Sequence, residues 1–267
     1  MIALRASFER LLHRIWYEGH WASHCLIPLS RLVEWEVRRR AALDLGKGVP
    51  QQGAKVWVIG GLTVGGTGKT PVLIALGEWL RHQGVSVGVI SRGYRGRVGK
   101  KAHIVSASDS ATDVGDEPLL IQNRLDCPVV VCRDRGAALA VMVRQFDVDV
   151  VLSDDGLQHY SLPRDLEVVV LDGKRGLGNG RIIPAGPLRE PAARLGSVDW
   201  VLERNSKDLD RSFEYGIRAV RQVSSGKSLS WPDWLVQLSG RPVTAITALG
   251  QPGQVFEMLE ERGLSVH

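Results

Sequence analysis

Residues 63–70 form a glycine-rich run that ends in a lysine and a threonine. In order, they are Thr63, Val64, Gly65, Gly66, Thr67, Gly68, Lys69 and Thr70. Glycines let backbone N–H groups turn toward phosphate oxygens, the lysine pairs with the β- and γ-phosphates of a nucleotide, and the final hydroxyl ligates Mg²⁺. The strict pattern has glycine where Thr63 stands, so the match is close without being literal. The alternative is a glycine-rich turn with an incidental lysine.

Two consecutive acids follow an apolar run at residues 148–152. Asp154 and Asp155 come directly after Ser153. Acids at the end of a buried strand are typical of the second metal-binding motif of P-loop proteins, and parallel sheets bind ligands at the carboxyl ends of their strands. Together with Thr70, the two acids predict an Mg²⁺ site. Without the glycine-rich run, the ordinary interpretation of such a pair is a turn or a helix cap.

An acid and an arginine elsewhere in the chain are further candidates. Asp116 lies in the run Gly-Asp-Glu-Pro at residues 115–118. Such an Asp commonly caps the following helix, but a kinase also needs a group that takes the proton of the acceptor hydroxyl. The residues alone leave both roles open. Residues 184–191 form a proline-rich loop with one arginine, Arg189, a residue type that stabilises charge on a transferring phosphoryl group.

Residues 91–96 read Ser-Arg-Gly-Tyr-Arg-Gly and follow another apolar run. This order places them at the same edge of a parallel sheet as the glycine-rich run. Arg92 or Arg95 suits an anionic substrate group, and Tyr94 suits stacking on a sugar face. Surface arginines in a turn are the alternative.

Alternating strand-like and helix-like patterns must position these residues. The alternation predicts an α/β fold of the P-loop NTPase type, with a mostly parallel sheet and flanking helices. Near-continuous apolar strands indicate a sheet that is buried on both faces. The expected strands are residues 55–59, 85–90, 128–132, 148–152, 167–171, 198–202 and 241–247, and the expected helices are residues 71–83, 117–124, 136–146 and 254–262.

Residues 1–45 differ in pattern from the rest of the chain. Apolar residues recur there at helical spacing among tryptophans and arginines, and residues 1–40 hold seven Arg against four Glu. Such an amphipathic helix can lie in the headgroup region of an anionic membrane, and the alternative is a helix packed on the core. The longest early stretch without Asp, Glu, Lys or Arg is residues 19–30, twelve residues, whereas a membrane-spanning helix needs about 20 apolar residues.

The composition is that of an ordinary globular protein, with 44% hydrophobic and 24% charged residues. A net charge of +5 and a pI near 9.3 favour acidic partners such as nucleotide or lipid phosphates. No recognised nucleic-acid-binding motif is present. The three cysteines show no C-x-x-C spacing, which argues against a disulfide framework or a zinc site and fits a reducing, cytoplasmic location.

Taken together, these motifs resemble those of one family, the tetraacyldisaccharide 4′-kinases of lipid A biosynthesis. The run Asp-Asp-Gly-Leu-Gln-His at residues 154–159 is the most specific part of the match. The resemblance covers nearly the whole chain in the right order. It is carried by residues 28–30, 63–71, 91–96, 115–118, 154–160, 164–165, 178–180 and 184–191.

The resemblance implies a reaction, its cofactors and the roles of individual residues. The reaction is transfer of the γ-phosphate of ATP, with Mg²⁺, to the 4′-hydroxyl of a tetraacyl glucosamine disaccharide 1-phosphate. The catalytic residues it implies are Asp116, Lys69 and Arg189, and the metal ligands are Thr70, Asp154 and Asp155. The residues it places around the phosphates and the sugar head are Arg92, Tyr94, Gln158 and His159.

The resemblance also implies a location and a set of partners. The N-terminal helix docks on the inner leaflet, so the protein is peripheral at the cytoplasmic face of the bacterial inner membrane. Its substrate is the lipid disaccharide, and neither nucleic acid nor an obligate protein partner is implied. We expect a membrane-docking helical segment at residues 1–45, a P-loop kinase core at residues 46–240 and the start of a smaller C-terminal lobe at residues 241–267.

The sequence departs from the family pattern in two places. Gly61 stands where an asparagine is expected just before the glycine-rich run. The family also has a C-terminal Asp-His-His-type motif whose histidine supports the catalytic aspartate, and the chain ends at His267, where the segment leading to that motif should begin. We therefore expect an incomplete C-terminal lobe, a truncated sequence and impaired activity of the 267-residue form.

A P-loop nucleotide switch is the alternative function, either a metallochaperone-like GTPase or a partitioning-type ATPase. A guanine-specific switch needs the run Asn-Lys-x-Asp. The nearest run is Asn-Ser-Lys-Asp at residues 205–208, in which the lysine is displaced by one position. The sequence therefore favours the kinase.

Overall fold

A computed structural model describes residues 2–44, 53–94, 96–98, 101–208, 210–247 and 252–267. The chain forms two compact units, Met1–Phe213 and Glu214–His267. All the predicted site residues that the structure describes belong to the first unit.

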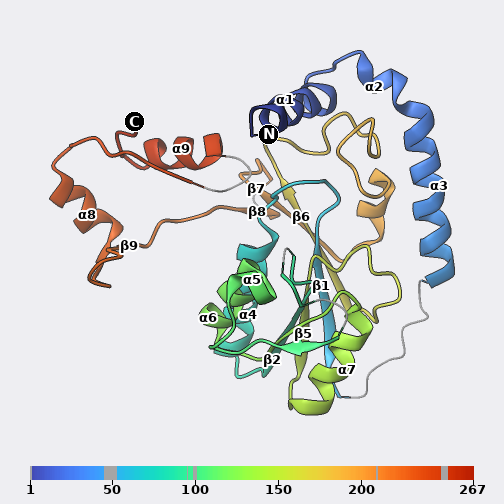
Figure 1. Cartoon of the computed structure of the whole chain (residues 1–267), viewed down its shortest axis with the longest axis horizontal. Helices are drawn as coiled ribbons and strands as arrows, with labels where there is room; N and C mark the ends of the chain where they lie inside the picture. The colour runs from blue at the N-terminus through green and yellow to red at the C-terminus, as the bar shows by residue number, and fades with distance from the viewer. Residues whose placement is uncertain (1, 45–52, 95, 99–100, 209, 248–251) are drawn as a thin grey trace. The chain divides into compact units, whose positions relative to one another are not determined.

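Three helices form the N-terminal part of the first unit, drawn in blue in Figure 1. They are α1 (Ile2–Tyr17), α2 (Ala22–Cys25) and α3 (Ile27–Asp44). The predicted amphipathic segment is therefore helical but is broken near Gly19, which has a φ of 71°. Glycine adopts this left-handed conformation readily, and other residues rarely do.

The strands of the first unit form an eight-stranded sheet among the described residues. Its order is β3-β4-β2-β5-β1-β6-β7-β8. Every neighbouring pair is parallel except β3 with β4. The strands are β1 (Lys55–Gly60), β2 (Val87–Ser91), β3 (His103–Ile104), β4 (Val129–Val131), β5 (Val150–Asp154), β6 (Leu166–Asp172), β7 (Trp200–Arg204) and β8 (Ser212–Phe213). The predicted mostly parallel sheet is confirmed. The two-residue strands β3 and β8 were not predicted from the sequence pattern.

Helices and loops cover both faces of this sheet. Apolar residues of α4 (Lys69–His82) and α6 (Asp116–Leu125) share one buried cluster with the strands. Residues of α7 (Arg135–Gln145) share a second cluster with the loops around residues 157–162 and 182–188. The 3-10 helix η1 (Ala192–Ser197) and α3 pack against the second cluster. Burial on both faces explains why the central strands read as continuous apolar runs. A short helix, α5 (Ala111–Val114), precedes α6.

The second unit holds a short hairpin and two helices among its described residues. Strands β9 (Ala219–Arg221) and β10 (Ser228–Ser230) pair antiparallel, and the helices are α8 (Trp231–Leu238) and α9 (Pro252–Glu261). The helix predicted at residues 254–262 is confirmed. The strand predicted at residues 241–247 is wrong: Val243 alone forms a bridge there, to Val266. The neighbouring Pro242 lacks the N–H that a strand ladder needs.

Candidate active site

The glycine-rich run forms the loop between β1 and α4. Gly68 is the N-cap of α4 with a φ of 92°, and Gly65 has a φ of 109°. Both angles are ones that only glycine adopts without strain. The amino end of α4, which begins at Lys69, favours anions. The Thr67 hydroxyl is buried and has no hydrogen-bond partner among the described residues, so it is placed to donate to a bound anion.

Backbone pairing explains why threonine replaces glycine at the first position of the motif. Thr63 forms an antiparallel bridge with Leu188, and the Val64 N–H donates to the Pro187 carbonyl at 2.8 Å. Thr63 is buried and does not have a positive φ. Extended backbone of this kind suits a β-branched side chain. The departure from the strict motif therefore leaves the loop intact.

Four predicted site residues contact one another beside this loop. Arg189 Nη1 donates to both carboxylate oxygens of Asp155, at 3.0 and 2.9 Å, and to Gln158 Oε1 at 3.0 Å. Lys69 Nζ lies 3.6 Å from Asp155 Oδ1. Although burial opposes the shift, the charges of Lys69 and Arg189 lower the pKa of Asp155. The predicted lysine, acid and arginine therefore form one cluster.

Asp154, the last residue of β5, is held differently from Asp155. Its side chain is buried and accepts a hydrogen bond from Ser91 Oγ at 3.1 Å. The buried guanidinium of Arg135 donates to its backbone carbonyl at 2.8 Å. Burial and repulsion from Asp155 raise the pKa of Asp154. A cation near this carboxylate would relieve both effects.

The start of α6 adds two more acids. Gly115 is the N-cap of α6, so Asp116 occupies the first turn and its alternative role as a helix cap is wrong. Solvent reaches part of the Glu117 side chain, yet desolvation and the charge of Asp154 raise the pKa of Glu117 to about 7, against the opposing effect of Lys69. These interactions place the start of α6 beside the phosphate loop.

The predicted sugar-binding residues lie around the same edge of the sheet. Burial, together with the charges of Arg135 and Arg92, lowers the pKa of His159 to about 4, so this imidazole is neutral at pH 7. Tyr94 is exposed in the loop that follows β2. Arg95 lies outside the described residues.

Sequence reasoning gave no role to four residues that the structure places at the site. Ser91, Glu117 and Glu190 each stand next to a predicted residue, and this adjacency was the available signal. Glu190 accepts a hydrogen bond from Gln158 Nε2 at 2.8 Å. Arg135 carried no signal, because its contacts are with the backbone carbonyls of Cys132 and Asp154.

The predicted metal ligands are all oxygen donors, the type that Mg²⁺ prefers. Thr70 is in the first turn of α4, and Asp154 and Asp155 follow one another at the end of β5. In the part of the chain that the structure describes, no group of three or more His, Cys, Asp or Glu side chains could hold a metal ion. Mg²⁺ commonly uses one or two carboxylates and completes its shell with water and phosphate oxygens. The residues therefore fit Mg²⁺ shared with a nucleotide.

The N-terminal helices are hydrogen-bonded to the loop that pairs with the phosphate loop. Ser30 Oγ donates to the Ile182 carbonyl at 2.7 Å and accepts from the Ala185 N–H at 2.9 Å. Trp16 Nε1 donates to the Pro184 carbonyl at 2.9 Å. The same loop continues to the residues that bridge the glycine-rich run. The helices are thus attached to the segment that supports the site.

The parallel sheet, the glycine-rich loop at its carboxyl edge and the lysine–aspartate–arginine cluster define a P-loop α/β protein. The family model described as LpxK, tetraacyldisaccharide-1-P 4′-kinase, matches residues 22–267. The chain belongs to this tetraacyldisaccharide 4′-kinase family, which favours a kinase over a nucleotide switch.

Individual relatives agree with this assignment. The chain is 43% identical over 262 residues to the tetraacyldisaccharide 4′-kinase of Shewanella oneidensis, covering 97% of this chain and 76% of that protein. It is 45% identical over 261 residues to that of Alcanivorax borkumensis, covering 97% and 79%. The crystal structure of LpxK from Aquifex aeolicus in complex with ATP has a TM-score of 0.74 and 28% identity, covering 92% of this chain and 80% of that one.

Proposed function

We propose that this chain transfers the γ-phosphate of ATP to the 4′-hydroxyl of a tetraacyl glucosamine disaccharide 1-phosphate. The observation that carries the proposal is the cluster of Lys69, Asp155 and Arg189 beside a P-loop in a member of the 4′-kinase family. The ATP complex of the Aquifex relative supports ATP as the donor.

The phosphate loop binds and orients the nucleotide in this proposal. Backbone N–H groups at the start of α4 and the unpartnered Thr67 hydroxyl face the phosphates. Lys69 carries positive charge to the β- and γ-phosphates. Thr70, Asp154 and Asp155 would hold Mg²⁺, which would supply positive charge to the phosphate oxygens.

The acceptor hydroxyl needs a base and a binding surface for its sugar. Asp116, in the first turn of α6, takes the proton of the 4′-hydroxyl. Arg189 stabilises charge on the transferring group. The residues that contact the sugar head and its phosphate are Arg92, Tyr94, Gln158 and His159. Because His159 is neutral at pH 7, it acts in this arrangement as a hydrogen-bonding group and contributes no charge.

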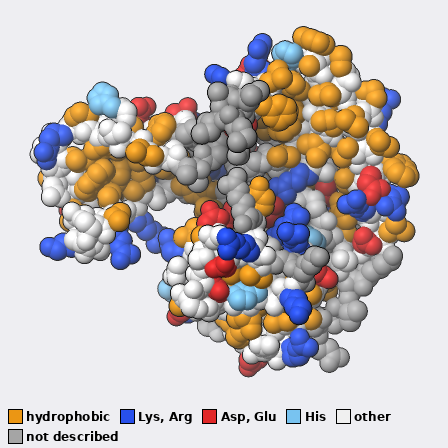
Figure 2. Space-filling view, in the orientation of Figure 1, with side chains coloured by type: hydrophobic (Ala, Val, Ile, Leu, Met, Phe, Trp, Pro, Cys, Tyr) orange, Lys and Arg blue, Asp and Glu red, His pale blue; other side chains and the backbone are white. Residues whose placement is uncertain are grey.

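The N-terminal helices dock on the inner leaflet, where the lipid substrate resides. Leu29, Leu32 and Trp35 are exposed and lie three residues apart along α3, so they share one side of the helix. Figure 2 shows hydrophobic side chains gathered over the N-terminal helices. Among the described residues, every helix is too short or too polar to cross a bilayer. An interfacial position suits exposed apolar residues next to arginines.

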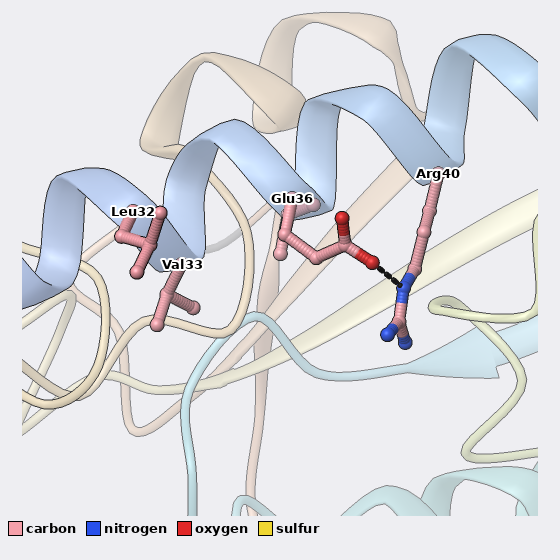
Figure 3. A pocket seen from close by; sticks show the side chains of 5 residues that line it. Leu32, Val33, Glu36 and Arg40 are labelled. Atoms are coloured by element: carbon pink, nitrogen blue, oxygen red, sulfur yellow. Dashed lines mark hydrogen bonds and ion pairs between the residues drawn. The ribbon is translucent and has the colours of Figure 1, made fainter.

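A hollow on α3 shows how apolar and charged groups alternate there. It is lined by Leu32, Val33, Glu36, Val37 and Arg40. Figure 3 shows Leu32 and Val33 at one end and the hydrogen-bonded pair of Glu36 and Arg40 at the other. The mixture of an apolar wall and an ion pair fits the boundary between acyl chains and headgroups.

The division of the chain into a membrane-docking segment, a kinase core and the start of a C-terminal lobe stays a prediction.

The activity is tested by incubating the chain with ATP, Mg²⁺ and the lipid disaccharide and measuring phosphate on the lipid. We expect lipid-dependent release of ADP with stoichiometric phosphorylation of the lipid. ATP hydrolysis that proceeds equally well without lipid, and leaves the lipid unmodified, would favour the nucleotide switch instead.

Membrane docking is tested with vesicles that contain anionic phospholipid. The double variant Leu32→Ser with Trp35→Ser should bind at least about 10-fold more weakly, because burying one large apolar side chain contributes about 1.5–3 kcal/mol. Trp79, exposed on α4, provides the matched control, and Trp79→Ser should bind like the wild type. Equal binding of the double variant and the wild type would refute docking through α3.

A further inference from the structure

Two arginines and two glutamates form an enclosed network of ion pairs among residues 164–194. Its members are Arg164, Glu167, Arg194 and Glu190, whose side chains are 12%, 9%, 16% and 3% exposed. Their formal charges cancel. Charges this deeply buried are costly unless each has a partner in good geometry, so removal of one member disturbs the others.

One arm of the network holds the loop after β5. Arg164 Nη1 donates to Glu167 Oε1 at 2.6 Å. The same guanidinium donates to three backbone carbonyls, those of Leu157 at 3.3 Å, Leu162 at 3.2 Å and His159. The guanidinium of Arg164 thereby holds the backbone of residues 157–162 in place.

The other arm passes through Arg194 to the predicted site. Arg194 Nη2 donates to Glu167, and its Nε lies 3.5 Å from Glu190 Oε2. Glu190 Oε1 accepts from Gln158 Nε2 at 2.8 Å, and that nitrogen also lies 3.3 Å from the Gly61 carbonyl, just before the phosphate loop. Arg194 therefore joins both arms, since its guanidinium spans the two glutamates.

The chain of contacts ends on the charged cluster. Gln158 Oε1 accepts from Arg189 Nη1, and this nitrogen is the one that donates to Asp155. The amide of Gln158 thus has one orientation, with its N–H₂ toward Glu190 and its oxygen toward Arg189. If Glu190 moved or became neutral, the amide would lose the partner that sets this orientation.

We propose that Arg194 is a positioning residue for phosphoryl transfer, which holds Arg189 against Asp155 through Glu190 and Gln158. The inference rests on the proposed kinase function. Arginine suits the task because a planar fork contacts two carboxylates at once, whereas lysine presents a single point charge. Burial and the charge of Glu190 raise the pKa of Tyr160, so this neighbour is neutral and cannot replace the charge of Arg194.

The first test compares Arg194→Met with a matched control. Arg204→Met also removes an enclosed arginine, because Arg204 pairs with Asp172 at 2.7 Å with side chains 13% and 3% exposed. For equal amounts of folded protein, we expect Arg194→Met to lower kcat about 10-fold or more, with the KM for ATP changed less than about 3-fold. Arg204→Met should keep the wild-type kcat. Equal kcat losses in the two variants would overturn the proposal.

Two further variants separate positioning from a general loss of structure. Arg194→Lys keeps a positive charge near Glu190 and should recover part of the kcat. Adding Arg194→Met to Gln158→Ala should lower kcat no further than Gln158→Ala alone, because both act on the same chain of contacts. Multiplicative losses in the double variant would contradict the chain.

Hydrogen exchange tests the positioning role of Arg194 without a measurement of turnover. In Arg194→Met, or in Arg194→Lys if the first does not fold, peptides covering residues 157–162 and 187–190 should exchange faster than in the wild type and in Arg204→Met. Unchanged exchange would overturn the inference. Absence of lipid phosphorylation by the wild-type chain would instead refute the proposed function, so the two failures are distinguishable.

Discussion

Replacement of Lys69 by methionine removes the cation of the phosphate loop with little change in side-chain volume. Lys69 Nζ lies 3.6 Å from Asp155 Oδ1 and its side chain is 12% exposed. At an effective dielectric constant of about 20, two unit charges at this distance interact by about 5 kcal/mol. Asp155 is 37% exposed, so screening by solvent reduces the net contribution to about 1 kcal/mol. We therefore expect a small loss of stability.

The effect on catalysis should be much larger than the effect on folding. Removal of one group that stabilises developing charge typically costs about 3–4 kcal/mol in the transition state, which corresponds to a rate about 10²–10³-fold lower. Lys69→Met should therefore fold but transfer phosphate at least about 100-fold more slowly. We expect this difference because Arg189 continues to neutralise Asp155 in the resting protein, whereas the positive charge that Lys69 is proposed to bring to the β- and γ-phosphates is lost.

The assay is steady-state phosphoryl transfer combined with urea denaturation of the same preparations. Lys55 provides the matched control, because its Nζ lies 3.5 Å from Asp165 but its side chain is 71% exposed. Lys55→Met should keep both activity and stability. Turnover of Lys69→Met near that of the wild type would refute the assignment of residues 63–70 as the nucleotide loop.

Three other substitutions test the surroundings of the site. Ser30→Ala leaves the buried Ala185 N–H without the hydroxyl that accepts its hydrogen bond, whereas the Ile182 carbonyl still accepts from the Gly186 N–H at 3.1 Å. The substitution should lower the free energy of unfolding by about 1–3 kcal/mol, measured by thermal denaturation, and an equal loss in the exposed control Ser225→Ala would contradict this. Glu117 binds a proton more tightly in the folded state, with its pKa raised from 4.5 to about 7, so its contribution to stability is fully present below pH 4.5 and is lost as the pH rises through about 7. Glu117→Gln should remove this part of the pH dependence in urea titrations at pH 5 and pH 8, and identical profiles would refute the charge environment described here. Thr63→Gly restores the strict motif but removes a buried β-branched residue from extended backbone; calorimetric titration should show no tighter ATP binding, and a large gain in affinity would contradict the role given to the backbone pairing.

The sheet and its phosphate loop were predictable because their signals are local. Burial on both faces makes β1, β2, β5 and β6 read as apolar runs, and the glycine-rich loop needs its residue types at fixed spacing. The edge strands β3 and β8 have two residues each, too few to form a pattern. The strand expected at residues 241–247 shows the converse, since only Val243 forms a bridge there, to Val266, and Pro242 lacks the N–H that a strand ladder needs.

The cluster at the site was predictable in its members but not in its connections. Asp155, Gln158 and Arg189 were each indicated by motif, yet the hydrogen bonds among them join residues 31 and 34 positions apart. The supporting residues Arg135 and Arg194 also contact groups far away in the sequence, the Asp154 carbonyl and Glu167, respectively. Their residue type gives no hint of this, because arginines are ordinarily solvated surface residues.

The most direct test of the account is to locate the transferred phosphate on the lipid. The chain is incubated with γ-labelled ATP, Mg²⁺ and tetraacyl disaccharide 1-phosphate, and the product is analysed by mass spectrometry and ³¹P NMR. We expect one new phosphomonoester on the 4′-oxygen of the non-reducing glucosamine, and we expect it to be absent with Lys69→Met. Label found only in inorganic phosphate, or at another oxygen of the lipid, would contradict it.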